Sequence, residues 1–287
     1  MKGIQGAAGP VQRSSRSQAT GVSRRLQCAS YARCSFACPR RITAVSCRGD
    51  NGMRRVAAAR SVRLRIHRCA ILYSPNNKRD MVARFFRVSH NRAVMFKPLP
   101  AIFPRHSAPV VRGTADGERE IVTMNWGFML LQNCRAPRPV TNVRDDKILL
   151  SSFWKTSFLE RRCLVPASSF CEPNDDVKPA TWHWFALKGG ERPLFAFPGI
   201  WRRYSGPVKK DGPNVDIETY AFLTTTPNSL VATINHERMP VMLTREEEFD
   251  TWLRGSADEA FALARKYPPD KMRIVQEGSY KEDRVAA

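Results

Sequence analysis

Long apolar runs are missing from this sequence. No stretch of its 287 residues approaches the roughly 18–20 consecutive apolar residues that a membrane-spanning helix needs. The hydrophobic content of 43% and the 15 Phe residues are still sufficient for a sizeable core. We therefore expect a soluble protein without a membrane partner, with room for one large or two small domains.

Cysteine pairs at metal-binding spacing are missing as well. The eight Cys residues include no Cys-x-x-Cys pair, and the amino-terminal ones have no His at a zinc-finger distance. We therefore expect no metal site and no cofactor. Nothing in a chain of this length indicates a secreted disulfide scaffold, so the reducing cytoplasm is the expected compartment.

Acidic residues are nearly absent from the first 70 positions, which contain 15 Lys and Arg and a single acid, Asp50. The remaining 217 residues contain 32 Lys and Arg and 25 acids, so most of the formal charge of +21 lies at the amino-terminal end. A basic chain favours a polyanion partner, with nucleic acid first, although the remainder is only moderately basic.

These differences in composition and charge divide the chain into a basic, low-complexity extension at residues 1–68 and a folded domain at residues 69–287. Three interpretations of the extension stay open: a disordered basic arm, an organelle transit peptide, or upstream DNA translated by mistake. The third is favoured by the arrangement of residues 68–71 described below.

Short strands rich in aromatic and apolar residues predominate after residue 69. We predict strands at 69–74, 110–112, 120–124, 163–166, 182–187, 193–201 and 220–225, and a hairpin loop at 202–217. Helices are predicted at about 78–88 and after two capping boxes, Thr244 with Glu247 and Ser256 with Glu259. Many strands and few helices, without strict alternation, predict an α+β fold made mostly of antiparallel sheet.

Four short segments contain the residue types that chemistry needs. Asn142 and Arg144 follow a Pro-bearing loop, where an amide can position a ligand and a guanidinium can hold a phosphate; an ordinary turn is the alternative. Glu172 ends an apolar run, where a carboxyl can act as a general acid or base, or can simply be solvated. Trp126 can stack on a base or pack in the core.

The fourth segment, His236 to Val241, places a titratable His, a fixed cation at Arg238 and a stiffening Pro within five residues. A solvated loop is the alternative interpretation. The apolar neighbours of Cys163 and Cys171 in the sequence favour packing over nucleophilic chemistry for these two thiols.

Read in order, the motifs are Trp-Gly-Phe (126–128), Thr-Asn-Val-Arg (141–144), the run ending in Glu (161–172), Phe-Pro-Gly-Ile-Trp (197–201), Phe-Leu-Thr-Thr-x-x-Asn (222–228) and His-x-Arg-Met-Pro-Val (236–241). This series resembles the SOS-response-associated peptidase (SRAP) family of abasic-site shielding proteins. The resemblance extends from about residue 69 to about 275, and implies a single domain with a barrel-like β core and flanking helices.

The resemblance also implies a function. In that family an amino-terminal Cys, exposed when the protein cleaves off its own initiator Met, reacts with the aldehyde of an abasic site in single-stranded DNA and closes a thiazolidine ring. By match, Asn142, Glu172 and His236 are the catalytic positions beside the Cys, whose counterpart is Cys69. Arg144, Arg238 and Trp126 are the implied DNA-binding positions. The expected partner is abasic single-stranded DNA, the expected state a monomer, and the expected location the bacterial cytoplasm, at the nucleoid.

The match fails at the amino-terminal end, because Cys69 is internal and has no free α-amine. Aligning Leu72 with the family opening Met-Cys-Asn-Leu-Tyr-Ser moves the Cys position to Ala70. If Arg68 to Ile71 are encoded CGA TGT GCA ATC, the bases from the last A of the first codon spell Met-Cys-Asn. We therefore hypothesise that residues 1–68 are read out of frame, through a one-base insertion. The family also has Tyr and Trp flanking the Glu, where this chain has Cys171 and Pro173.

Two other functions stay open. Cys69 and His236 can form the dyad of a conventional peptidase that acts on other chains. A non-catalytic module for single-stranded DNA predicts salt-sensitive binding without a covalent adduct.

Overall fold

The computed structural model describes residues 71–75, 79–92, 99–133, 135–190 and 192–284. All of them lie in one of the two units into which the chain divides, residues 64–287. The predicted extension at 1–68 and Cys69 lie outside the described residues. None of the helices in the described part is long and apolar enough to span a membrane.

The described part is mostly strand. The strands are β1 (Leu72–Ser74), β2 (His90–Asn91), β3 (Ser107–Gly113), β4 (Arg119–Trp126), β5 (Phe128–Gln132), β6 (Arg135–Val140), β7 (Asn142–Arg144), β8 (Arg162–Ala167), β9 (Ser169–Asn174), β10 (Thr181–Leu187), β11 (Phe195–Pro207), β12 (Asn214–Thr225), β13 (Met239–Pro240) and β14 (Met272–Gly278). The helices are α1 (Arg79–Phe85), α2 (Asp145–Ile148), α3 (Ser152–Glu160), α4 (Ser229–Ala232), α5 (Glu246–Arg254), α6 (Ala257–Ala262) and the 3-10 turn η1 (Pro269–Lys271).

Five strands close into a barrel. The order β12–β11–β8–β3–β4 is antiparallel throughout, and the parallel pairing of β4 with β12, at Asn125↔Thr219 and Trp126↔Tyr220, joins the two ends of the ring. Closure removes the free edges that an open sheet would expose. The predicted α+β class, mostly antiparallel sheet and barrel-like core are thus confirmed.

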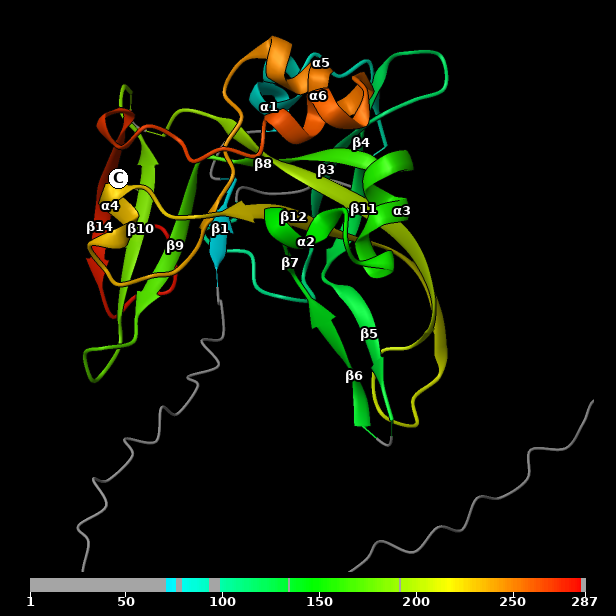
Figure 1. Ribbon diagram of the computed structural model, residues 1–287, viewed down its shortest axis with the longest axis horizontal. Helices are drawn as coiled ribbons and strands as arrows, with labels where there is room; N and C mark the ends of the chain where they lie inside the picture. Colours follow the sequence, from blue (N-terminus) through cyan, green and yellow to red (C-terminus); the bar gives the residue numbers. More distant parts are fainter. Residues whose placement is uncertain (1–70, 76–78, 93–98, 134, 191, 285–287) are drawn as a thin grey trace, which may run out of the picture. The chain divides into compact units, whose positions relative to one another are not determined.

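A second sheet of four antiparallel strands, β1–β9–β10–β14, lies beside the barrel (Figure 1). Tyr73 and Phe185 both pair with Phe170, and all three side chains belong to the same core cluster as the barrel interior. The alternate residues, among them Cys171 and Trp184, pack on the opposite face. This sheet therefore turns one face toward the barrel.

Aromatic rings fill the barrel. Phe222 stacks on Trp126 at 5.3 Å between ring centroids and on Phe197 at 4.5 Å, and Tyr73 meets Trp126 edge-on at 5.2 Å. The Tyr73 and Tyr220 hydroxyls hydrogen-bond inside this cluster. Each such side chain removes about 150–250 Å² from water, so the cluster is a main source of stability.

Helix α5 covers the outside of the barrel at β3 and β8, with α1 and α6 close to it (Figure 1). Its Trp252 is fully buried and donates Nε1–H to the carbonyls of Cys163 and Gly199, at 2.8 and 3.0 Å. Phe249 of the same helix contacts Phe86, just after α1, at 5.0 Å. Buried Trp side chains need such acceptors, which orients α5 on the sheet.

Of the local features predicted from the sequence, one capping box is confirmed and one is wrong. The capping box of Ser256 and Glu259 at α6 is confirmed by reciprocal hydrogen bonds of 3.2 and 2.8 Å. The box predicted for Thr244 and Glu247 is wrong, because Glu248 accepts from the Thr244 backbone N–H instead. The hairpin loop predicted at 202–217 is too long: β11 extends to Pro207 and β12 begins at Asn214, because cross-strand pairing outweighs the polar composition of these residues.

The hairpin of β5 and β6 was not predicted. It begins at Gly127, whose φ of +117° is one that side-chain-bearing residues rarely adopt. A Cβ atom at Gly127 would also lie 2.6 Å from Cβ of Pro139 on the facing strand. Glycine is therefore required at this turn, which positions the segment that leads into Asn142.

Candidate functional site

The candidate site is centred on a carboxyl and an imidazole that fold together. Glu172 Oε2 lies 3.1 Å from His236 Nε2, and the two side chains are 0% and 12% exposed. At this ion-pair distance one proton can be shared between the two side chains after a small adjustment. The structure thus joins two residues that the sequence predicted separately.

The burial of Glu172 follows from its place in β9. Its side chain lies on the same strand face as Phe170, a core residue, and β9 has a partner strand on each side. Removal from water raises the pKa of the Glu172 carboxyl well above its usual value. Burial therefore favours the neutral acid, as expected for a group that donates a proton near neutral pH.

The orientation of His236 is set by its second ring nitrogen. Nδ1 lies 2.8 Å from the backbone carbonyl oxygen of Arg238. Because a carbonyl can only accept, we assign a proton to Nδ1. Nε2 then faces Glu172 either as a bare acceptor or as the second N–H of an imidazolium.

Strand β1 leads directly to this pair. Its first residue, Leu72, pairs with Cys171, the neighbour of Glu172. Ile71, which precedes β1, is buried. The chain therefore enters the described structure beside the acid, although Cys69, the predicted nucleophile, lies outside the described residues.

The Asn142 segment joins the site through β12. Asn142 opens β7, and its backbone pairs with Phe222, while Arg144 pairs with Thr224. Thr224 also pairs with Pro240 on its other side. The two predicted motifs, around Asn142 and around His236, are thus held on either side of one strand.

The two predicted phosphate-binding arginines lie in different surroundings. The Arg144 side chain is 54% exposed and holds Asp146 by two hydrogen bonds of 2.9 Å. The Arg238 side chain is 12% exposed and donates to Asp145 and to the Thr224 carbonyl. Arg238 therefore connects the His236 segment to the start of α2, and only Arg144 presents its guanidinium to solvent.

Trp126 is fully buried and donates Nε1–H to the Thr141 carbonyl at 3.0 Å. This arrangement supports the packing interpretation, and a ring without exposure cannot stack on a base in this structure. Cys163 and Cys171 are buried too, and burial is the main cause that raises both thiol pKa values above their usual range. Both act as packing residues, as expected.

Two residues of the site were missed by the sequence reasoning. His183 on β10 pairs directly with Glu172, so its side chain stands on the same face of the sheet, and its Nδ1 is buried. The only signal was a His within a strand of aromatic residues. Asp145 was missed because an acid after Arg144 looked like an ordinary surface charge.

Several proteins are similar to this chain. Abasic site processing protein YoqW of Bacillus subtilis (strain 168) is 31% identical over 141 residues, which are 48% of this chain and 59% of that protein. Abasic site processing protein YoaM of the same strain is 30% identical over 142 residues, with the same shares. The chain thus spans about three fifths of the length of the curated relatives that it matches.

Crystal structures share the fold. A Bacteroides thetaiotaomicron protein superposes with a TM-score of 0.57 at 22% identity, covering 71% of this chain and 91% of that one. A Bordetella bronchiseptica protein gives a TM-score of 0.57 at 20% identity, covering 74% and 100%. The family model described as SOS response associated peptidase (SRAP) matches residues 68–277, which is most of the sequence. The chain therefore belongs to the SRAP family.

Proposed function

We propose that this protein binds single-stranded DNA at abasic sites and, when a Cys begins its chain, forms a covalent thiazolidine link there. The contact between Glu172 and His236, beside the point where β1 enters the structure, carries the proposal. Two relatives bear the name abasic site processing protein, which supports the substrate.

The chemistry needs one aldehyde, one amine and one thiol. The α-amine of the Cys attacks the aldehyde carbon of the ring-opened sugar, and loss of water leaves an imine. The thiol sulfur then adds to the imine carbon and the imine nitrogen takes up a proton, which closes the ring. An α-amine has a pKa near 8, so a useful fraction is neutral at pH 7.

Proton transfer in these steps falls to the buried pair. The neutral Glu172 carboxyl donates a proton to the departing hydroxyl, and His236 takes up and returns protons at the sugar oxygen. Both also serve the hydrolysis that removes the initiator Met. Asn142 positions the sugar or the Cys, through an amide that can donate and accept.

The proposed DNA contacts of each side chain depend on how exposed it is. Arg144 holds a phosphate, since its guanidinium is half exposed. For Arg238, the phosphate role stays a prediction, because Asp145 and Thr224 already occupy its Nη2. Trp126 is buried, so it contributes to the DNA path indirectly, by packing under the Gly127 turn. The acting form is a monomer in the bacterial cytoplasm, at the nucleoid.

Residues 1–68 are, in this proposal, an extension read out of frame, and the domain proper is 69–287. The family match begins at residue 68, which supports the division. Codons 68–71 that cannot be read as ATG TGC AAY in the shifted frame would exclude the frame hypothesis.

The decisive experiment compares the full chain with a version that begins Met-Cys-Asn-Leu-Tyr-Ser. Both are incubated with abasic single-stranded DNA and resolved on a denaturing gel. We expect an adduct from the second protein and none from the first. Peptide turnover that disappears in Cys69→Ala would instead indicate a peptidase, and salt-sensitive binding without an adduct in either protein would indicate a non-catalytic module.

A further inference from the structure

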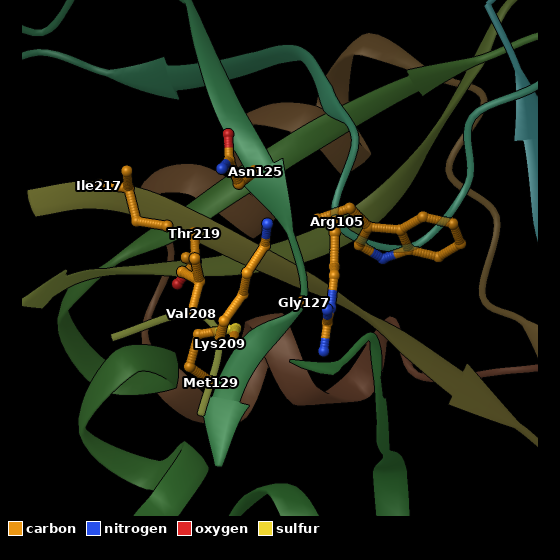
Figure 2. Close-up of a pocket in the computed structure, with 9 residues that line it drawn as sticks. Arg105, Asn125, Gly127, Met129, Val208, Lys209, Ile217 and Thr219 are labelled. Carbon is orange, nitrogen blue, oxygen red and sulfur yellow. The ribbon is translucent and has the colours of Figure 1, made fainter. Parts of the chain in front are cut away.

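A pocket lies next to the predicted DNA-binding segment, at the barrel end where β4 meets β12 (Figure 2). Its volume is about 170 Å³. The floor and walls are mainly apolar, with Trp126, Met129, Val208 and Ile217 among the lining residues. Ordinary small-molecule sites have about 300–1,000 Å³, so this pocket has room for one ring system rather than for a whole nucleotide.

Two cations stand at the pocket, Arg105 and Lys209 (Figure 2). Both are exposed, and among the described residues neither forms an ion pair with an acid. The Arg105 guanidinium donates to the Pro137 carbonyl, at 3.2 Å. An apolar recess with two unpaired cations suits a ligand that joins an apolar ring to an anion.

The backbone at Arg105 supports a built site. Its φ of +73° is unusual for a residue with a long side chain. Its N–H nevertheless donates to the Trp126 carbonyl at 2.8 Å, which holds the strained conformation in place. Strain of this kind, at a cost of about 1–3 kcal/mol, is found preferentially at functional positions.

Two uncharged polar side chains line the pocket, Asn125 and Thr219, and the Thr219 hydroxyl donates to the Arg202 carbonyl at 3.2 Å. Asn125 Oδ1 accepts from the Ser107 hydroxyl at 2.7 Å, which fixes the amide and leaves Nδ2 without an acceptor among the described residues. In Figure 2 the Lys209 side chain extends toward Asn125, whereas Arg105 lies beside Gly127. A ring with an acceptor atom on its edge can therefore find a donor inside the pocket.

The pocket lies within one strand of the candidate site. Asn125 pairs with Thr219 of β12, and Asn142 pairs with Phe222 on the same strand. Three residues along a strand span about 10 Å. This distance places the pocket within one or two nucleotides of Asn142 on an extended strand of nucleic acid.

We propose that this pocket receives one unpaired base of the bound single strand, adjacent to the abasic position, while Arg105 and Lys209 hold the phosphates that flank it. The inference rests on the proposed function and adds to it a subsite for the nucleotide beside the lesion. Enclosure of a single base between apolar side chains does not depend on which base it is, so the subsite anchors the strand without selecting a base.

The test measures fluorescence anisotropy of the full chain with short single-stranded oligonucleotides that carry a non-reactive abasic analogue. Each oligonucleotide of the series also lacks the base of one further nucleotide, at a different position next to the abasic analogue. We expect deletion at one position to weaken binding about tenfold, and deletion elsewhere to have little effect. Val208→Phe, which fills the pocket from the turn between β11 and β12, removes that position dependence, and so does Lys209→Gln in part.

Lys210→Gln is the matched control, since Lys210 is exposed, carries the same charge and does not line the pocket. It should keep the position dependence in full. Equal binding whichever base is deleted, with tight binding retained, overturns the subsite and leaves the proposed function standing. No binding to any oligonucleotide overturns both. Free mononucleotides that bind as tightly as the oligonucleotide, in a Lys209-dependent manner, overturn the assignment to a strand.

Discussion

Glu172 Oε2 and His236 Nε2 lie 3.1 Å apart, and they come from β9 and from the loop that precedes β13. The acid has no exposed surface, whereas the imidazole keeps a small exposed edge. Proton exchange between the two is therefore possible inside the protein while one of them still meets the substrate.

The first prediction concerns stability and pH in Glu172→Gln. Because burial raises the pKa of Glu172, the folded state keeps a proton that the unfolded state loses above about pH 4.5. The stabilising contribution of the protonated acid is complete below that pH and is lost as pH rises toward the folded-state pKa. The unfolding free energy of the wild type should therefore fall, relative to the variant, by about 1.4 kcal/mol for each pH unit in this window.

Urea unfolding of both proteins from pH 4.5 to 8 measures this difference. Glu160→Gln is the control, because its side chain is 59% exposed and keeps its hydration. A difference between wild type and Glu172→Gln that stays constant with pH would show that the Glu172 carboxyl is ionised throughout.

The second prediction concerns catalysis in the version that begins Met-Cys-Asn-Leu-Tyr-Ser. Glu172→Gln and His236→Gln should each slow adduct formation by about 10²–10⁴-fold, as expected for the loss of a proton-transfer group. Because the two share one proton path, the double variant should be little slower than either single one. Single-turnover gels measure the rates.

His90→Gln serves as the control for this experiment, since His90 is about half exposed and lies outside the site. It should react at the wild-type rate. Additive losses in the double variant would mean that the acid and the imidazole act in separate steps.

The third prediction separates the two arginines. Arg238→Gln removes the partner of Asp145, whose side chain is only 19% exposed, and should cost about 2–4 kcal/mol of unfolding free energy. Arg144→Gln breaks an exposed pair and should cost less than about 1 kcal/mol. It should, however, weaken single-stranded DNA binding and reduce the salt slope by about one.

Chemical denaturation and salt titrations of DNA binding measure both effects. If Arg238→Gln is stable and loses DNA affinity, Arg238 leaves Asp145 in solution and binds phosphate, as the family resemblance implies.

The fourth prediction concerns Gly127. In Gly127→Ala the new methyl group meets Pro139 at 2.6 Å, and the φ of +117° becomes strained. We expect a loss of more than about 2 kcal/mol, together with displacement of the hairpin of β5 and β6. Gly113→Ala, which adds a methyl group in open space, should change the stability by less than about 0.5 kcal/mol. Thermal melts compare the two, and equal shifts would contradict the steric argument.

The sequence alone was sufficient for the class of fold and for the family. Aromatic strands in non-alternating order predicted the mixed, mainly antiparallel architecture, because strand periodicity is a local property. The order of six motifs predicted the family, because each motif keeps its residue types within a few positions. The capping box at Ser256 was also predicted correctly, since all its atoms lie within one turn.

Features that depend on pairing between distant parts of the chain could not be predicted from the sequence. The length of β11 and β12 depends on each strand finding the other, and their polar residues gave the opposite indication. The hairpin of β5 and β6 depends on one left-handed glycine and on the proline that it faces. Neither partner can be recognised from its own neighbourhood in the sequence.

In the site, too, residue types could be predicted from the sequence, whereas burial and contacts could not. Residue types and spacing pointed to Glu172 and His236 as a possible acid and base, and to two arginines as equivalents. Only the tertiary structure decided that the acid is fully buried, that the imidazole reaches it, and that Arg238 is engaged by Asp145 while Arg144 is open to solvent. Burial and distance arise from strands that pair across the fold, so they depend on every partner being in place.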